Sequence, residues 1–116
     1  MTPEERDYAY LWDMLHSAIA ALSYVEGLSP EAAVSDEMRM AAFERKLEVL
    51  GEAAKRVSSE FVQMHPEIPW RGMIGLRNVL AHNYGEIDRQ RLRETACREL
   101  PGLITALRTL QPPIEE

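Results

Sequence analysis

Four side chains that could take part in phosphate chemistry lie close together near residue 80. Arg77 and Asn78 lie within an otherwise apolar segment predicted to be helical, and His82 and Tyr84 lie where that segment ends. Burying an unpaired guanidinium is expensive, so an arginine on a packed helix face is expected to be either paired or used. Arginine carries a permanently charged fork that matches phosphate, and histidine exchanges protons near neutral pH. The pattern therefore indicates a candidate site.

Helical geometry decides which of these side chains share a face. Arg77 and Tyr84 are seven positions apart, so they lie within roughly 20° of each other, and Asn78 and His82 also share a face. Arg77 and His82 diverge by roughly 140° on a regular helix. The reach of the arginine side chain covers part of that angle. Helix termination over residues 83–85, where asparagine and glycine tolerate left-handed backbone, could supply the rest. We expect the site at a helix end.

The first two helices are predicted from apolar residues that recur three and four positions apart. A capping box at residues 2–5, with proline at the first helical position, starts the first helix, and Gly27 stops it. A connector over residues 28–35 is expected to hold one short turn opened by a Ser-Pro pair. The second helix is expected to begin near Asp36 and to continue to Phe61. The predicted inward faces are Tyr8, Leu11, Trp12, Leu15, Ile19, Leu22 and Val25 on the first helix, and Phe43, Leu47, Leu50, Ala54, Val57 and Phe61 on the second.

Two more helices are predicted in the second half of the chain. The third begins at Pro69 or Trp70, and the fourth begins after Asp88 as N-cap. Pro101 and Gly102 are expected to kink or break the fourth helix. The predicted inward faces are Trp70, Met73, Ile74, Arg77, Leu80 and Ala81, followed by Leu92, Ala96, Leu100, Leu103, Leu107 and Leu110.

The pattern as a whole predicts one all-α domain. No alternation typical of strands is present, so we expect an antiparallel bundle of four long helices, with one short helix in addition. The domain is expected over residues 1–111, with a short tail at 112–116. The acidic start has no basic patch followed by an apolar run, and no apolar stretch is long enough to span a bilayer. These features favour a cytoplasmic protein without membrane contact.

Charge is distributed unevenly along the chain. The net charge of −6 argues mildly against nucleic-acid binding, because phosphate neutralisation supplies much of that affinity. Up to Glu37, however, Arg6 is the only basic residue against eight acidic ones. Over residues 69–98 the balance reverses, with six arginines against three acidic residues. The candidate site therefore lies in the basic part of the chain.

Each candidate residue also has a purely structural interpretation. An ion pair of Arg77 with Glu48 or Glu52 is as plausible from spacing as a role in catalysis. His82 could cap or pack the helix, and Tyr84 could cap it with a packed ring and a solvated hydroxyl. No His, Cys and acidic residues have metal-ligand spacing, so no metal or cofactor is expected. The residues interpreted as structural are His16, His65, Trp12, Trp70 and Cys97, together with Arg91 and Arg98 as a solvated face.

The motif resembles that of a known superfamily. The spacing Arg77-x-x-x-x-His82 resembles the signature of the HEPN superfamily, and the longer form that ends in Tyr84 resembles its HepT branch. Three flanking segments also resemble the family and lie in the same order: residues 50–54 (Leu-Gly-Glu-Ala-Ala), 68–78 before the site and 87–88 after it. A bare Arg-x-x-x-x-His occurs by chance, whereas this combination spans most of the chain and is more specific.

This resemblance implies a metal-independent RNA endonuclease. Arg77 would stabilise the phosphate charge, His82 would transfer protons, and Asn78 would orient His82 or the phosphate. One chain offers one such histidine, so a homodimer would bring two copies of the motif to a common cleft. The expected product end is a 2′,3′-cyclic phosphate.

The HepT branch further implies regulation by a partner. In that branch, which forms type VII-like toxin–antitoxin pairs, a minimal nucleotidyltransferase of the MntA kind attaches AMP units to the tyrosine that corresponds to Tyr84. The added charge and base would lie in the groove expected to hold RNA. Two other functions stay open: a non-catalytic substrate-binding or assembly subunit of a nucleotidyltransferase complex, and a helical dimerisation module without chemistry. The second leaves the arginine on an apolar face unexplained.

Overall fold

The chain folds into helices joined by short connectors. The computed structural model describes residues 1–82 and 89–110, although for 77–79, 81 and 82 it describes only the backbone. No strand occurs within these ranges, so the all-α class is confirmed. Two short helices are present where one was predicted. In order the helices are α1 (Pro3–Val25), α2 (Pro30–Ser35), α3 (Glu37–Arg56), α4 (Ser59–Met64), α5 (Trp70–His82) and α6 (Arg89–Thr109).

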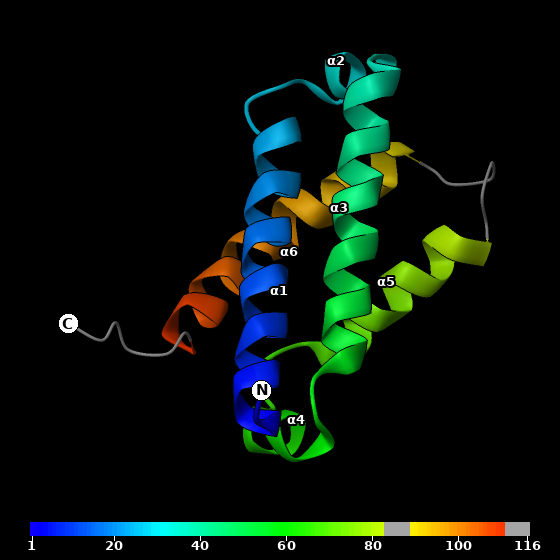
Figure 1. Cartoon of the computed structure of the whole chain (residues 1–116). Helices are drawn as coiled ribbons and strands as arrows, with labels where there is room; N and C mark the ends of the chain where they lie inside the picture. Colours follow the sequence, from blue (N-terminus) through cyan, green and yellow to red (C-terminus); the bar gives the residue numbers. More distant parts are fainter. Residues whose placement is uncertain (83–88, 111–116) are drawn as a thin grey trace.

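Two upright helices form the framework, and two oblique helices pack against it (Figure 1). α1 and α3 lie side by side and make the most extensive helix contact. α5 packs on α3, whereas α6 packs across α1. α5 and α1 thus lie on opposite sides of α3 in the view of Figure 1. No helix within the described residues is long and apolar enough to cross a membrane.

The predicted helix starts in the first half of the chain are confirmed. The Thr2 hydroxyl accepts a hydrogen bond from the Glu5 amide at 3.1 Å, and the Thr2 amide donates to the Glu5 carboxylate at 3.0 Å. α1 ends just before Gly27, whose φ of 81° suits glycine. Asp36 caps α3 by accepting from the Arg39 amide at 3.0 Å, and this hydrogen bond lowers the pKa of the Asp36 carboxyl.

The second long helix ends earlier than predicted. α3 stops at Arg56, and Ser58 caps the separate helix α4 with its hydroxyl accepting from the Phe61 amide at 3.3 Å. Asp7 of α1 holds this break in place, because its carboxylate accepts from the Ser58 amide at 2.8 Å and from the Ser58 hydroxyl at 2.6 Å. Asp7 is only 7% exposed. A buried carboxylate with two donors fixes the start of α4 against the first turns of α1.

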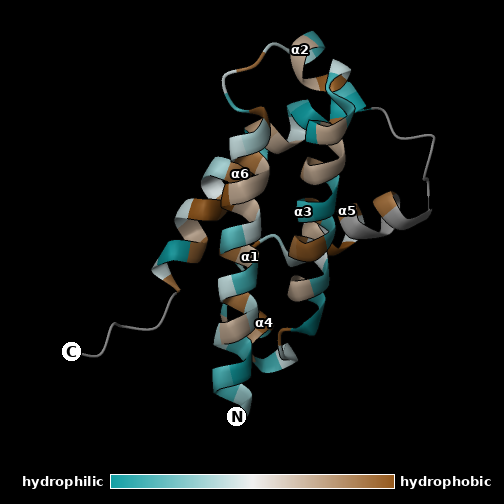
Figure 2. Cartoon of the chain, turned by 45° about the horizontal axis from the view of Figure 1, so that its top comes forward, coloured by the Kyte–Doolittle hydropathy of each residue, from teal (hydrophilic) through white to brown (hydrophobic). Residues whose placement is uncertain are grey.

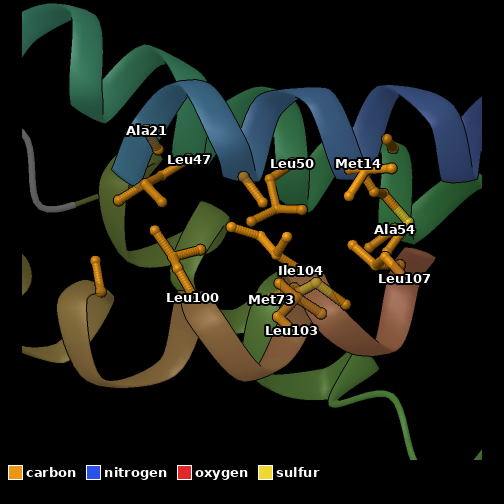
Figure 3. Close-up of a cluster of buried hydrophobic side chains, with 14 of the residues drawn as sticks. Met14, Ala21, Leu47, Leu50, Ala54, Met73, Leu100, Leu103, Ile104 and Leu107 are labelled. Carbon is orange, nitrogen blue, oxygen red and sulfur yellow. The ribbon is translucent and has the colours of Figure 1, made fainter. Parts of the chain in front are cut away.

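The core lies where the four longer helices meet (Figure 3). The side chains labelled there come from α1, α3, α5 and α6 and point toward one another. Brown and beige stretches alternate with teal along α1 and α3 in Figure 2, as expected for helices with one apolar face. The interpretation of Trp70 as a core residue is confirmed, because its side chain is buried. The same interpretation of Trp12 is wrong, because Trp12 is 54% exposed. On α1 Leu11, Leu15 and Val25 are buried as predicted, but Met14, Ala18 and Ala21 are buried too, so the centre of the inward face is rotated from the predicted one.

α6 continues through Pro101, so the predicted break does not occur. Proline in a helix interior removes one backbone hydrogen bond and disfavours the helix by about 3 kcal/mol. Leu100, Leu103, Ile104 and Leu107 flank it and are buried. Burial of a large apolar side chain contributes roughly 1.5–3 kcal/mol, so this packing outweighs the effect of the proline.

Replacement of Asp7 is expected to destabilise the fold. Asp7→Ala leaves the Ser58 amide and hydroxyl without their buried acceptor, which should lower the free energy of unfolding by about 1–3 kcal/mol. Chemical denaturation measures this change. Asp13→Ala on the same helix is the control, because Asp13 is exposed and should change stability by less than about 0.5 kcal/mol. Equal stability of the two variants would contradict the importance of this link.

Candidate functional site

The start of α5, the helix that bears the motif, is anchored in the core. The Trp70 indole N–H donates a hydrogen bond to the His65 carbonyl at 2.9 Å, and the Trp70 ring meets Phe61 edge-on at 6.4 Å. The His65 ring packs against Phe61 at a tilt of 35°, with centroids 4.5 Å apart, and its ring nitrogen lies 3.0 Å from the Glu67 carboxylate. His65 is therefore a structural residue, as predicted. These contacts fix where α5 begins relative to α4.

Three of the four predicted site residues lie in the last two turns of α5. Arg77, Asn78 and His82 fall within Trp70–His82, so the structure brings their backbones together on one helix. Their side chains are outside the description, as are Tyr84 and the predicted N-cap Asp88. The roles assigned to these residues, and the turn expected after His82, stay predictions.

Position 77 lies in register with the buried face of α5. Trp70, Met73 and Leu80 are buried, and position 77 is separated from them by seven, four and three residues. Such spacings place these positions along one side of a helix. That side packs on α3. Position 82 is turned by roughly 140° from position 77 on the same regular helix. The backbone therefore presents the arginine and histidine positions in different directions.

The two glutamates that could pair with Arg77 lie on α3 and have neighbours on their own helix. The Glu48 carboxylate lies 3.3 Å from the Arg45 guanidinium, and the Glu52 carboxylate lies 3.3 Å from the Arg56 guanidinium. Both ion pairs are half-exposed, so each contributes less than about 1 kcal/mol.

Two arginines of the basic segment serve the fold. Arg89 donates to both oxygens of Glu44, at 3.3 and 3.4 Å, and the Glu44 side chain is only 14% exposed. Arg93 donates to the Leu28 carbonyl at 2.7 Å. These contacts bind the first turns of α6 to α3 and to the loop before α2. Sequence reasoning missed them, because a carboxylate 45 residues away gives no local signal. The charge available to a ligand is correspondingly smaller than the arginine count suggests.

The other residues that were interpreted as structural differ in how far they are buried. Arg98 is exposed and lies 3.4 Å from its neighbour Glu99, in agreement with a solvated face. Arg91 is also exposed. Cys97 is half-buried against the core, as predicted. His16 is exposed, and its ring stacks on Trp12 with centroids 3.7 Å apart.

An apolar groove runs alongside the motif helix. It has a volume of about 380 Å³ and lies between α5 and α6, with α3 as its floor. Leu47 and Leu50 of α3 are part of the core, whereas Leu76 of α5 and Thr95 of α6 are half-buried. Leu76 directly precedes Arg77. The groove was not predicted, because it results from the separation of two helices and not from their sequence pattern.

These features define a class of protein: all-α, with an arginine and a histidine in the last turns of one helix. Residues 14–110 match the family described as Ribonuclease HepT-like. The chain belongs to this HEPN-type family, as the resemblance implied.

Relatives of similar length are named as RNases. One from Methanocaldococcus jannaschii, provisionally named an RNase, is 32% identical over 82% of this chain and 87% of its own. One from Caldanaerobacter subterraneus subsp. tengcongensis, also provisionally named an RNase, is 35% identical over 81% of this chain and 84% of its own. A third, from Thermococcus cleftensis, is provisionally named ribonuclease HepT and is 34% identical over 78% and 86%. No solved structure matches the chain.

Proposed function

We propose that this protein is a metal-independent RNA endonuclease and the toxin of a type VII-like toxin–antitoxin pair. The observation that supports it best is the position of Arg77 and His82 in the last two turns of α5, in a chain of the HepT-like family. The relatives named as RNases support RNA as the substrate. The cytoplasm, where RNA and a partner enzyme are both present, is the proposed site of action.

The reaction needs three contributions. A base removes the proton of the ribose 2′-hydroxyl, and the 2′-oxygen attacks the neighbouring phosphorus. The bond from phosphorus to the 5′-oxygen breaks, and an acid protonates that oxygen as it leaves. A cation stabilises the charge on the phosphorus oxygens. Arg77 is the proposed cation, and His82 is the proposed proton carrier. The products are a 2′,3′-cyclic phosphate and a 5′-hydroxyl.

Asn78 and the end of α5 assist this chemistry. Asn78 precedes His82 by one helical turn, and we propose from this spacing that its amide orients the imidazole or the scissile phosphate. The carbonyl end of a helix carries partial negative charge, so the end of α5 suits a cationic group. In the proposed reaction the histidine that acts as the acid is protonated.

A homodimer is part of the proposal, because one histidine cannot be base and acid in the same step. A two-fold axis beside the end of α5 would place His82 and Arg77 of both chains in one cleft. The apolar groove between α5 and α6 supports this arrangement. It lies next to the motif, and contact with a second chain would remove its apolar lining from water, which favours association.

Tyr84 is proposed as the regulatory residue. A partner nucleotidyltransferase of the MntA kind would join AMP to the Tyr84 hydroxyl through a phosphodiester, with pyrophosphate leaving from ATP. The modification adds negative charge and a base two residues beyond His82, so RNA would be repelled and excluded.

A non-catalytic role is the second candidate. The same fold could serve as the substrate-binding or assembly subunit of a nucleotidyltransferase complex. The presence of Arg77, Asn78, His82 and Tyr84 together favours the enzyme, because a binding subunit has no need of an acid–base residue beside a phosphate-binding one.

His82→Ala is expected to abolish RNA cleavage and toxicity without loss of structure. Removal of the proton carrier should lower the rate on the order of 100-fold or more, and Arg77→Ala should have a similar effect. Cleavage of labelled RNA by purified protein measures this, with circular dichroism as the check on folding. His16→Ala is the matched control, because His16 is exposed on α1. Activity that survives His82→Ala, or that disappears with EDTA, contradicts the mechanism.

Tyr84→Phe removes only the acceptor oxygen, so the variant is expected to stay toxic and to escape silencing by modification. Mass spectrometry after incubation with the cognate nucleotidyltransferase and ATP should find AMP on the native chain alone. Tyr24→Phe is the control, since Tyr24 is half-buried in α1. An AMP adduct on any other residue would show that the acceptor was assigned wrongly.

Thr95→Lys is expected to shift the dimer toward monomer and to lower cleavage in parallel. The substitution puts a charge into the apolar groove, where a partner surface would bury it. Sedimentation at micromolar concentration measures the assembly state, and Thr109→Lys on the exposed side of α6 is the control. A monomeric native chain that still cleaves RNA argues against the shared cleft.

A further inference from the structure

The outer surface of α1 carries an aromatic pair that neither the core nor the proposed site uses. Trp12 is 54% exposed, the value of a surface residue although tryptophan is the largest apolar side chain. His16 lies over it, with ring centroids 3.7 Å apart and planes inclined by 22°, and its Nδ1 lies 2.9 Å from the Trp12 carbonyl oxygen. The pair is held in one conformation by this contact, so an apolar partner could bind it with little loss of side-chain freedom.

The same surface extends into a hollow between α1 and α6. Ile19 and Ser23 follow Trp12 and His16 at spacings of seven residues, so all four share one face of α1. The hollow has a volume of about 330 Å³. We call Trp12, His16 and the hollow together the α1–α6 face. The hollow is lined by Ile19, Leu22, Ser23, Glu26, Pro101, Ile104, Thr105 and Arg108.

Charge around this face is predominantly negative. Asp13 follows Trp12 directly and is exposed, Glu5 is exposed two turns before Trp12, and Glu26 lines the hollow, whose described lining contains one basic residue, Arg108. Along α1 itself Arg6 is the only basic residue against three exposed acidic ones, Glu4, Glu5 and Asp13. RNA is a poor occupant of such a surface, because phosphate and carboxylate repel each other. A second copy in a two-fold arrangement is also a poor occupant, since the acidic face would meet itself.

We infer that the α1–α6 face docks a protein partner whose contact segment joins an apolar side chain with lysine or arginine. The apolar group would fill the hollow, which begins two turns along α1 from Trp12, and the cations would meet Asp13 and Glu26 or lie on the tryptophan ring. Trp12 would become buried at the centre of the contact, with charged residues around it. This is the common arrangement of a protein interface.

The inference rests on the proposed function in one respect: the nucleotidyltransferase is the partner that we assign to this face. α1 and α5 lie on opposite sides of α3 in Figure 1, so a partner on the α1–α6 face leaves the motif helix uncovered. Docking and modification of Tyr84 would then be separate contacts. An enzyme bound to α1 stays tethered to the chain at high local concentration, which favours addition of several AMP units.

The test uses the full chain and the nucleotidyltransferase encoded beside it, both purified. Trp12→Ala should weaken binding at least tenfold in calorimetry, and Asp13→Lys should weaken it further as salt is lowered. Trp12→Phe keeps the ring and should retain most of the affinity. Glu67→Lys is the charge control, because Glu67 is exposed in the loop before α5 and lies on neither α1 nor α6. RNA cleavage by free Trp12→Ala should equal that of the native chain.

Each result decides between interpretations. Native binding that is lost in Trp12→Ala, with cleavage unchanged, supports the docking face. Native binding that is unchanged in Trp12→Ala overturns it while leaving the proposed function intact. Loss of the homodimer or of RNA affinity in Trp12→Ala also overturns it, because the occupant is then a second copy or RNA. A native chain that cleaves RNA but does not bind the nucleotidyltransferase refutes the partner itself, and this outcome is separate from the effect of His82→Ala.

Discussion

The packing of α3 between α1 and α5 is the contact on which the rest of the structure depends. α3 buries large side chains such as Phe43 and Leu47 and also small ones, Gly51, Ala53 and Ala54. Small residues let neighbouring helices approach closely, and α1 presents Ala18 and Ala21 in return. Because α5 rests on α3 and α6 on α1, an error in the α1–α3 contact would displace both oblique helices. The position of α5 therefore depends on the contact between α1 and α3, which contains no residue of the motif.

Buried polar links fix the ends of the helices against this framework. Asp7 holds the start of α4, and Glu44 holds the start of α6 through Arg89. Each joins segments that are distant in sequence, and each satisfies groups that would be expensive to bury alone. Arg93 does the same for the loop carbonyl of Leu28. The start of α5 is held in the same way by the Trp70 indole, which donates to the His65 carbonyl, so both helices that the Tyr84 segment connects are anchored at their starts.

Sequence periodicity predicted the helices well and their burial less well. Capping residues are local, so the starts at Thr2 and Asp36 could be predicted from a few neighbouring side chains. The apolar stripe of α1 predicted its buried face only in part. Large side chains were expected to be buried, whereas Ala18 and Ala21 are buried in the structure and Trp12 is exposed. The apolar spacing up to Phe61 suggested one continuous helix, but the helix breaks before Ser58. The carboxylate that stabilises this break belongs to Asp7, 51 residues away in the sequence. The motif was found from residue types and spacing, while the groove beside it and the ion pair of Arg89 depend on tertiary packing.

The net charge of the chain is a poor guide to its affinity for RNA. α1 and α5 lie on opposite sides of α3 in Figure 1, so a helix separates the acidic surface of α1 from the motif helix. Charges farther apart than the Debye length, about 8 Å at physiological ionic strength, are largely screened from each other. A phosphate near the end of α5 responds mainly to the charges within one such length. A uniform charge of −6 would oppose RNA everywhere, whereas this segregated distribution opposes it at α1 and leaves the motif helix open to it. The acidic half of the chain can thus serve a protein contact without preventing nuclease chemistry in the basic half.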